Sequence, residues 1–295
     1  MRATVALLVL LVAACSGLAA PPGTTDSVSN SGTAASTETT PCLGPPNPPA
    51  PSDEAISAAI ALGGCQAGAV AVAGGSVWMV PHLDAVALRI DPATNNVIDR
   101  ISLGDRGPGA EIDAADDMVW ASVSSPSYDY ERLVRIDPTT GAIVAWVDAE
   151  AGFPVIGAGF VWATGPDGLY RIDPATNTVA AIIETGRCGP ITLDGRVFCI
   201  GSDEAVEIDP TTDAVRPVAG APSGSPVQAG DGLIWGVDGT SLWAFNPETL
   251  QVAVELQPPP GVAMWSLDAV VLDGTLWVAA SSQPGDPFRT SPDRL

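Results

Sequence analysis

The sequence predicts an all-β fold, and two observations lead to this prediction. A small turn followed by a strand with an aromatic residue recurs six times between residues 75 and 277. The aromatic residues follow one another at intervals of 36 to 42 residues, which is the length of a four-stranded antiparallel sheet. No helical period of useful length occurs within the repeats. We therefore predict a six-bladed β-propeller in which each repeat forms one blade.

The N-terminal residues have the layout of an export signal. They contain one positive charge at Arg2, an apolar run and small residues directly before Cys15. The apolar run is too short to span a bilayer as a permanent helix. The segment Val12–Cys15 resembles the bacterial lipobox, in which a peptidase cuts before the cysteine and the thiol carries diacylglycerol. This resemblance implies a signal peptide over residues 1–14, lipid on Cys15 and anchoring at the outer face of the cytoplasmic membrane. An ordinary secretory signal is the alternative.

Residues 15–52 are expected to form a tether. This segment is rich in Ser, Thr, Ala, Gly and Pro and has almost no large apolar side chain. Such a composition cannot bury enough surface to offset the entropy of the chain. The remaining residues, 53–295, are ample for one large all-β domain, and we expect this domain to be monomeric.

Charge and composition exclude several kinds of partner. The chain has a formal net charge of −22, and its twelve basic residues are all arginine. Nucleic acid is excluded because binding through counterion release requires a basic patch. The acidic residues are spread over turns, so we interpret them as a solvated surface; cation-dependent sensing through an acidic face is the alternative. His and Cys are not clustered at ligand spacing, so the sequence predicts no metal site and no cofactor.

The second strand of each repeat carries the aromatic residue that defines the pattern. The six aromatics are Trp78, Trp120, Trp162, Phe198, Trp235 and Trp277. Alternation of apolar residues along these strands indicates that one side of each strand packs on the neighbouring blade. We expect the aromatic side chains to form contacts from blade to blade.

The third strand of each of the first five repeats ends in an Asp-Pro or Asn-Pro turn. These turns begin at Asp91, Asp137, Asp173, Asp209 and Asn246. A side-chain oxygen at this position can accept a hydrogen bond from the amide two residues on, and proline presets φ at the next position. The aspartates could also be read as an array of functional carboxylates, but turn chemistry explains them. A fourth, outer strand is expected after each turn, for example over residues 96–103 and 178–183.

The last repeat lacks part of its blade at the C-terminus. Eighteen residues follow Trp277, which is too few for two more full strands and their turns. Residues 55–62 resemble the outer strand that precedes the fourth aromatic strand, but they have no blade of their own. We predict that residues 55–62 complete the sixth blade, because this pairing removes an exposed sheet edge.

Four cysteines remain once the lipidated cysteine is set aside, and an exported protein favours disulfides between them. A two-residue hairpin turn at Asp194–Gly195 brings Cys188 to within two residues of the position opposite Cys199. The spacing therefore favours a bond between Cys188 and Cys199. Cys42 and Cys65 form the remaining pair, which would join the end of the tether to the propeller.

The repeats resemble those of known propeller families. Ser-Val-Trp and Arg-Ile-Asp-Pro-Ala-Thr-Asn-Thr-Val, repeated across residues 55–295, resemble the YVTN and NHL-like repeats and the streptogramin (virginiamycin B) lyase propellers. The resemblance implies the fold more than an activity. In the lyases a histidine base near a glutamate on late blades opens a lactone with a bound magnesium ion. The single histidine of this chain, His82, lies in the first repeat, and the later repeats have no matching constellation.

The order of strands predicts that one side of the propeller carries the loops between second and third strands together with the links between blades. These segments contain Pro81 to Asp84, Arg106, Tyr128 to Arg132, Glu150, Phe153, Asp167, Arg187, Asp203, Glu204, Asp238, Pro258 to Trp265 and Ser281 to Asp286. Loops on a rigid scaffold commonly carry function.

The longest of these loops, residues 124–132, is the candidate binding site. It contains Tyr128, Asp129, Tyr130, Glu131 and Arg132. Aromatic residues beside charges suit recognition of a protein or glycan, although a tyrosine-containing loop can also be an ordinary surface loop. Because no catalytic motif is evident, we predict a non-enzymatic binding or scaffold protein whose partner belongs to the cell envelope. The alternative is a lyase or hydrolase of the streptogramin-lyase type that acts on a lactone or ester.

Overall fold

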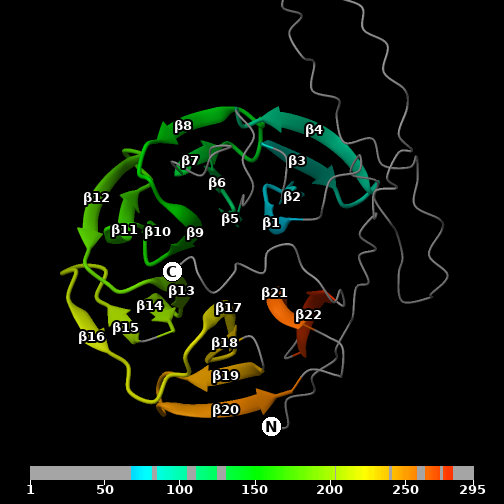
Figure 1. Ribbon diagram of the computed structural model, residues 1–295. Helices are drawn as coiled ribbons and strands as arrows, with labels where there is room; N and C mark the ends of the chain where they lie inside the picture. The colour runs from blue at the N-terminus through cyan, green and yellow to red at the C-terminus, as the bar shows by residue number, and fades with distance from the viewer. Residues whose placement is uncertain are drawn as a thin grey trace, which may run out of the picture.

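The computed structural model describes residues 68–81, 85–104, 111–124, 131–202, 204–238, 241–257, 263–272 and 275–281. Within these residues there is no helix, and five four-stranded antiparallel sheets are followed by a sheet of two strands. The predicted all-β class is therefore confirmed. The sheets lie side by side around a central axis in a propeller-like arrangement (Figure 1). The predicted signal peptide, tether and strand at 55–62 lie outside the described residues.

The strands have the following bounds. Sheet 1 consists of β1 (Ala69–Ala73), β2 (Ser76–Val80), β3 (Val86–Asp91) and β4 (Asn96–Ser102). Sheet 2 consists of β5 (Ile112–Ala115), β6 (Met118–Ser124), β7 (Glu131–Ile136) and β8 (Ile143–Val147). Sheet 3 consists of β9 (Gly152–Gly157), β10 (Phe160–Gly165), β11 (Gly168–Asp173) and β12 (Thr178–Ile183). Sheet 4 consists of β13 (Cys188–Leu193), β14 (Arg196–Gly201), β15 (Ala205–Ile208) and β16 (Val215–Pro217). Sheet 5 consists of β17 (Ser225–Gly230), β18 (Leu233–Val237), β19 (Leu242–Asn246) and β20 (Gln251–Leu256), and the last sheet of β21 (Ala263–Leu272) and β22 (Thr275–Ser281).

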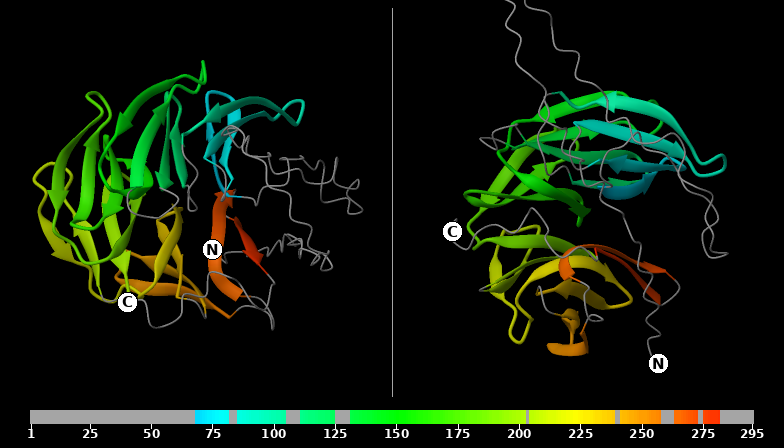
Figure 2. Two further views of the ribbon diagram at one scale, coloured as in Figure 1. Left: turned by 45° about the horizontal axis from the view of Figure 1, so that its top comes forward. Right: turned by 45° about the vertical axis from the view of Figure 1, so that its right-hand side comes forward.

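Each four-stranded sheet is a meander whose first strand lies nearest the central axis and whose fourth strand lies at the outer rim (Figure 1; Figure 2). The first strands contact one another in chain order, from β1 to β5, β9, β13, β17 and β21. Because neighbouring strands are antiparallel, the first hairpin of each sheet and its Asp-Pro turn share one face, which we call the turn face. The loops between second and third strands and the links between sheets share the opposite face, which we call the loop face.

Aromatic side chains fill the space between sheets, as the sequence predicts. Trp78, Trp120 and Trp162 are fully buried, and each belongs to an apolar cluster that includes residues of the next sheet. Trp78, for example, packs with Val119 and Ala121 of β6. The indole Nε1 of Trp162 donates to the Gly157 carbonyl of the adjacent first strand at 3.0 Å. The repeated aromatic thus secures both its own sheet and the contact with its neighbour.

The Asp-Pro turns have the predicted side-chain hydrogen bonds. The amide two residues on donates to the Asp or Asn side chain at 2.7 to 2.9 Å in all five turns, at Asp91, Asp137, Asp173, Asp209 and Asn246. The fifth residue of each turn has a left-handed φ between 56° and 72°, at Asn95, Gly141, Asn177, Asp213 and Leu250. These contacts confirm the interpretation of the aspartates as turn residues.

The structure joins Cys188 and Cys199, the pair that the sequence favours, in a disulfide with an S–S distance of 1.96 Å. Asp194 and Gly195 form the tight turn between β13 and β14, and the register places Pro190 opposite Cys199. The bond therefore runs diagonally across this hairpin. Cys42 and Cys65 lie outside the described residues.

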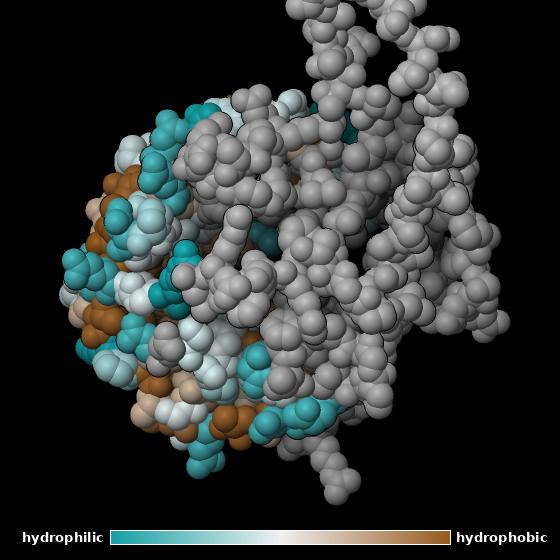
Figure 3. Space-filling model, in the orientation of Figure 1, coloured by the Kyte–Doolittle hydropathy of each residue, from teal (hydrophilic) through white to brown (hydrophobic). Residues whose placement is uncertain are grey.

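The outer rim exposes some apolar side chains to solvent. Along the fourth strands every second side chain tends to point outward, so Val144, Ile182 and Val252 are exposed. On the face seen in Figure 3, apolar and polar residues alternate over the described part of the rim. Such alternation is expected where one side of an antiparallel strand faces water.

Candidate functional site

The predicted binding loop is shorter in the structure than the sequence suggested. Strand β6 ends at Ser124 and β7 begins at Glu131, so residues 125–130 join the two strands on the loop face. Arg132 lies within β7, opposite Val123, because the pairing of β6 with β7 continues to the end of both strands. Glu131 and Arg132 are therefore strand residues and not loop residues. Tyr128, Asp129 and Tyr130 lie outside the described residues.

Arg132 anchors a charged and aromatic cluster beside this loop. Its Nε donates to Asp148 Oδ1 at 2.6 Å, and its guanidinium lies 4.9 Å from the centre of the Trp146 ring. The Asp148 side chain is 79% exposed and Trp146 is 36% exposed, so the contacts form at the surface. A guanidinium at this distance from an indole is held by a cation–π interaction.

The link from sheet 2 to sheet 3 continues directly from Asp148. Ala149 and Ala151 are buried in the same apolar cluster as Tyr170, whereas Asp148 and Glu150 point to solvent. The buried alanines fix the path of the link against β11. Two carboxylates are consequently presented side by side on the loop face.

Phe153, at the start of the innermost strand β9 and directly after this link, has an unusual backbone conformation. It has a φ of 55° and is 55% exposed, and it lies where the pairing of β9 with β10 shifts register. A bulky side chain rarely occupies the left-handed region. Glu150, with a φ of 46°, shares this feature. A β-bulge is a common device for redirecting a side chain near a functional site.

The strain at these two positions is not a property of the repeat. Among the described residues, all other non-glycine residues with positive φ belong to the first hairpins or the Asp-Pro turns, namely Asn95, Ala158, Asn177, Asp194, Asp213, Asp231 and Leu250. Glu150 and Phe153 lie instead at the junction of sheets 2 and 3. Backbone strain outside a turn that requires it is a reason to suspect a functional role.

A tyrosine and a third carboxylate complete the cluster. The Tyr170 hydroxyl donates to Asp167 Oδ2 at 3.3 Å, and Asp167 lies in the short turn between β10 and β11. Burial raises the pKa of the Tyr170 hydroxyl, and the negative charges of Asp167 and Glu150 raise the pKa further. Glu150 and Asp167 therefore act on the same ring. We call Arg132, Trp146, Asp148, Glu150, Phe153, Asp167 and Tyr170 the link cluster.

The link cluster was only partly predictable. Glu150, Phe153 and Asp167 are assigned to the loop face by the order of strands alone. Trp146 and Asp148 are missed because they lie in and after an outer strand, where the repeat has no aromatic position. The signal that could have found Trp146 is that it is a tryptophan outside the repeated second-strand position.

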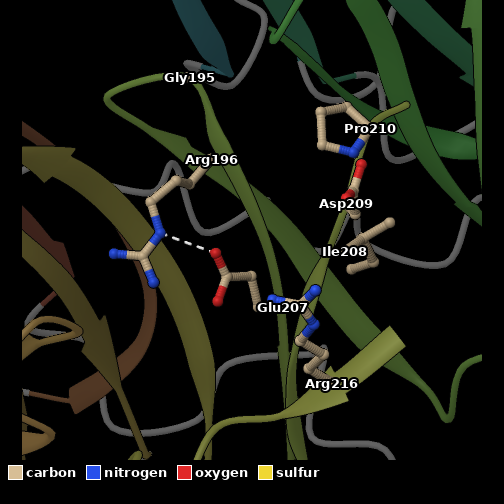
Figure 4. A pocket seen from close by; sticks show the side chains of 7 residues that line it. All are labelled: Gly195, Arg196, Glu207, Ile208, Asp209, Pro210 and Arg216. Atoms are coloured by element: carbon tan, nitrogen blue, oxygen red, sulfur yellow. Dashed lines mark hydrogen bonds and ion pairs between the residues drawn. The ribbon is translucent and has the colours of Figure 1, made fainter. Parts of the chain in front are cut away.

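A hollow on the turn face contains other charged residues (Figure 4). It has a volume of about 230 Å3, and Figure 4 shows Arg196 directed at Glu207 with Arg216 approaching from the opposite side. Arg196 Nε donates to Glu207 at 2.7 Å, and another nitrogen of the same guanidinium contacts Glu248 of the next sheet. The hydrogen bond from Arg196 is the main cause of the lowered pKa of Glu207. The charges of the hollow are therefore used to join sheets 4 and 5.

Arginines of the third strands make similar contacts on the turn face. Arg89 Nη1 donates to the Thr139 carbonyl at 2.9 Å, in the turn of the next sheet. Arg135 Nη1 reaches Asn177 Oδ1 at 3.0 Å, and Arg171 Nη1 lies 2.8 Å from Asp213 Oδ1. The signal for this role is an arginine that directly precedes the Ile-Asp-Pro sequence in three repeats.

The first strands are also joined by side chains near the axis. Asp113 Oδ2 accepts a hydrogen bond from the Ile156 amide of the next sheet at 2.7 Å. Thr192 Oγ1 donates to the Ile156 carbonyl at 3.2 Å from the sheet on the other side. Burial raises the pKa of Asp113, and the hydrogen bonds from Ile156 and Ala114 partly oppose this effect. Asp113 therefore has a structural role at the interface of sheets 2 and 3.

The remaining site predictions concern metals, membranes and the histidine. Across the described ranges, no group of three or more His, Cys, Asp or Glu side chains is placed to hold a metal ion. The part of the chain that the structure describes contains no helix long and apolar enough to cross a membrane. His82 lies outside this part. No family model matches the chain, and no curated protein matches it with significant similarity.

Proposed function

We propose that the chain is an exported, lipid-anchored six-bladed β-propeller that binds a protein of the cell envelope through its loop face. The observation that carries this proposal is the link cluster, where exposed aromatic and acidic side chains are held in a strained backbone conformation at one junction of sheets. The lipidated Cys15 and the tether over residues 15–52 would hold this face near the outer surface of the cytoplasmic membrane.

The turn face and the loop face differ in whether their side chains are available to a partner. On the turn face, Arg89, Arg135, Arg171 and Arg196 reach the next sheet and contact its turn. These side chains contribute to cohesion between sheets and are not available to a partner. On the loop face, the loops between second and third strands differ in length from sheet to sheet, from two residues between β10 and β11 to six between β6 and β7. Variation of loops on a regular scaffold favours recognition on that face.

Closure of the ring by a sixth blade is part of the proposal. Val70 and Val72 on β1 are 45% and 67% exposed, on the side of the strand that does not pack against sheet 2. Met79, Leu88 and Ile90 form a separate apolar cluster in sheet 1. Apolar residues on this side of sheet 1 suit contact with another blade. The strand at 55–62, paired with β21 and β22 and the C-terminal residues, would supply that blade.

Site-specific photo-crosslinking in intact cells tests the proposed binding face. A photoreactive residue placed at position 153 on the loop face is expected to form covalent adducts with an envelope protein. The same residue at Ala93, which is exposed in an Asp-Pro turn on the opposite face, serves as the matched control. Adducts at position 153 that are absent at position 93 support the proposal. Equal labelling at both positions, or none at position 153, contradicts it.

A further inference from the structure

We propose that the link cluster binds a basic peptide segment, in which arginine or lysine side chains lie next to an apolar residue. The inference rests on the proposed function of the loop face and names the chemistry of its partner. It follows from three properties of the cluster, which are the excess of negative over positive charge among its described side chains, its exposed aromatic surface and the conformation of Phe153.

The charges of the cluster do not balance. The positive charge of Arg132 is paired with Asp148 at 2.6 Å. Glu150 and Asp167 form no ion pair with any of the described residues, and the only hydrogen bond that Asp167 accepts there comes from the neutral Tyr170 hydroxyl. The chain as a whole carries a net charge of −22. A cationic partner is therefore attracted over a long range and finds carboxylates at the site, whereas an acidic partner is repelled.

The aromatic residues suit the same partner. The Trp146 ring lies 4.9 Å from the Arg132 guanidinium, so a cation of the chain itself already packs against this aromatic surface. Phe153 is 55% exposed and offers a second ring. An arginine or lysine of a partner can place its charge near Glu150 or Asp167 while its methylene groups cover an aromatic face.

The backbone of Phe153 adds an independent argument. Its left-handed φ of 55° would suit glycine or asparagine better than phenylalanine. Because the side chain is mostly exposed, its packing in the folded chain does not account for a phenylalanine at this position. A role in contact with a partner accounts both for the side chain and for the strain.

Binding of defined peptides to the full-length lipoprotein in neutral detergent micelles tests the inference. Three fluorescent peptides of equal length and equal apolar content carry arginine and lysine, glutamine, or glutamate at the same positions, and anisotropy reports their binding. The basic peptide is expected to bind at least about tenfold more tightly than the glutamine peptide. The glutamate peptide should bind weakest, and the affinity for the basic peptide should fall as salt is raised from 50 to 500 mM, because salt screens exposed charges.

Two variants and one control locate the site. Glu150→Gln is expected to lower the affinity for the basic peptide about fivefold, as the loss of one exposed ion pair predicts. Phe153→Asn should lower this affinity about tenfold, because an aromatic anchor commonly supplies much of the binding energy. Glu184→Gln is the matched control, since Glu184 is an exposed carboxylate on the next link, between sheets 3 and 4, and should leave the affinity unchanged.

Several results would overturn the inference. Equal weakening by Glu150→Gln and Glu184→Gln would mean that the acidic surface attracts basic peptides without a site. Equal binding of the basic and glutamine peptides would exclude charge recognition. If adducts form at position 153 while the basic peptide does not bind, the proposed function stands and the basic partner is wrong. Absence of adducts at position 153 would instead contradict the proposed function of the loop face, whatever the peptide experiment shows.

Discussion

At the scale of single residues, the arginine before the Ile-Asp-Pro sequence of sheets 1, 2 and 3 joins each of these sheets to the next. Arg135 reaches two acceptors in the following turn, the Pro174 carbonyl and Asn177 Oδ1. A planar guanidinium has several donors in a fixed arrangement and can serve both acceptors together, whereas an ammonium group cannot reproduce this geometry.

Replacement of Arg135 by lysine is therefore expected to destabilise the fold although the charge is kept. We expect the free energy of unfolding to fall by about 1 to 2 kcal/mol, because hydrogen bonds from a charged donor to partly buried acceptors are lost. Urea unfolding measures this change. Arg100→Lys on the outer strand β4 is the control and should change stability by less than about 0.5 kcal/mol. If Arg135→Lys leaves the free energy of unfolding unchanged, these contacts do not contribute to stability.

The aspartates of the turns make stability depend on pH. Hydrogen bonds from backbone amides lower the pKa of Asp91, Asp137 and Asp209 in the folded chain. A lowered folded pKa contributes stability that is present above the unfolded pKa, about 4, and is lost as the pH falls through the folded value. Asp113 has the opposite sign, because burial raises its pKa and its ionisation in the folded chain costs stability as the pH rises.

Asp137→Asn tests this origin of acid sensitivity. Asparagine keeps an oxygen that can accept the Thr139 amide hydrogen bond, as Asn246 does in the fifth turn. The variant should fold normally at neutral pH, and its stability should decline less than that of the parent chain when the pH is lowered from 5 to 3. Thermal unfolding at a series of pH values measures how the melting temperature of the parent chain and of the variant changes with pH. The same change in both chains would mean that the Asp137 carboxylate does not contribute to acid unfolding.

Phe153→Asn is expected to separate stability from binding. Asparagine tolerates the left-handed backbone, and the parent side chain is 55% exposed, so little buried apolar surface is lost. We expect the free energy of unfolding to stay constant or to rise by up to about 1 kcal/mol, while binding of the basic peptide falls. Urea unfolding measures the first quantity. A large loss of stability would instead assign Phe153 a role in packing.

The residues show why some contacts follow from sequence and others do not. The hydrogen bonds of the Asp-Pro turns were predicted because donor and acceptor are two residues apart. The contact from Arg135 to Pro174 spans 39 residues and depends on how neighbouring sheets meet. The strain at Phe153 depends on a register shift in β9, which no local pattern in the sequence indicates.

At the scale of the strand and hairpin, turn chemistry sets register and register sets the disulfide. Asp194 and Gly195 both have positive φ, which is typical of the tight hairpin turn that matches the twist of the strands. The pairing that follows from this turn brings Cys188 of β13 diagonally next to Cys199 of β14, with 5.2 Å between their Cα atoms. The sequence was sufficient here because the whole element is local.

Removal of this disulfide should cost stability without changing the fold. For Cys188→Ala with Cys199→Ala, we expect a loss of about 2 to 3 kcal/mol, as estimated for a short closed loop. Urea unfolding with and without a reducing agent measures the effect. The reductant should destabilise the parent chain more than the double variant, which keeps only the predicted Cys42–Cys65 pair. Equal stability of the parent and the variant under oxidising conditions would contradict a stabilising bond.

At the scale of the whole molecule, the six-fold repeat predicted the all-β class and the four-stranded sheets, while the link cluster was missed as a unit. The repeat encodes what the five four-stranded sheets share, namely the aromatic strand and the Asp-Pro or Asn-Pro turn. The cluster arises where Trp146, Glu150 and Phe153 depart from the repeat. Such departures have no internal copy with which they can be compared. Closure of the ring depends on pairing between the two ends of the domain, and it stays a prediction.

A pair of deletions tests closure by its energetic consequence. Removing residues 55–62 would leave the predicted sixth blade without its outer strand. The deletion also removes the apolar side chains of Ile56, Ile60 and Leu62, and each such side chain contributes about 1.5 to 3 kcal/mol when it is buried. We expect the free energy of unfolding to fall by more than about 3 kcal/mol and amide exchange to quicken in β21 and β22. Deleting residues 25–32 in the tether, an equal length, should change neither quantity. If the two deletions behave alike, residues 55–62 do not complete a blade, and the exposure of Val70 and Val72 on β1 needs another explanation.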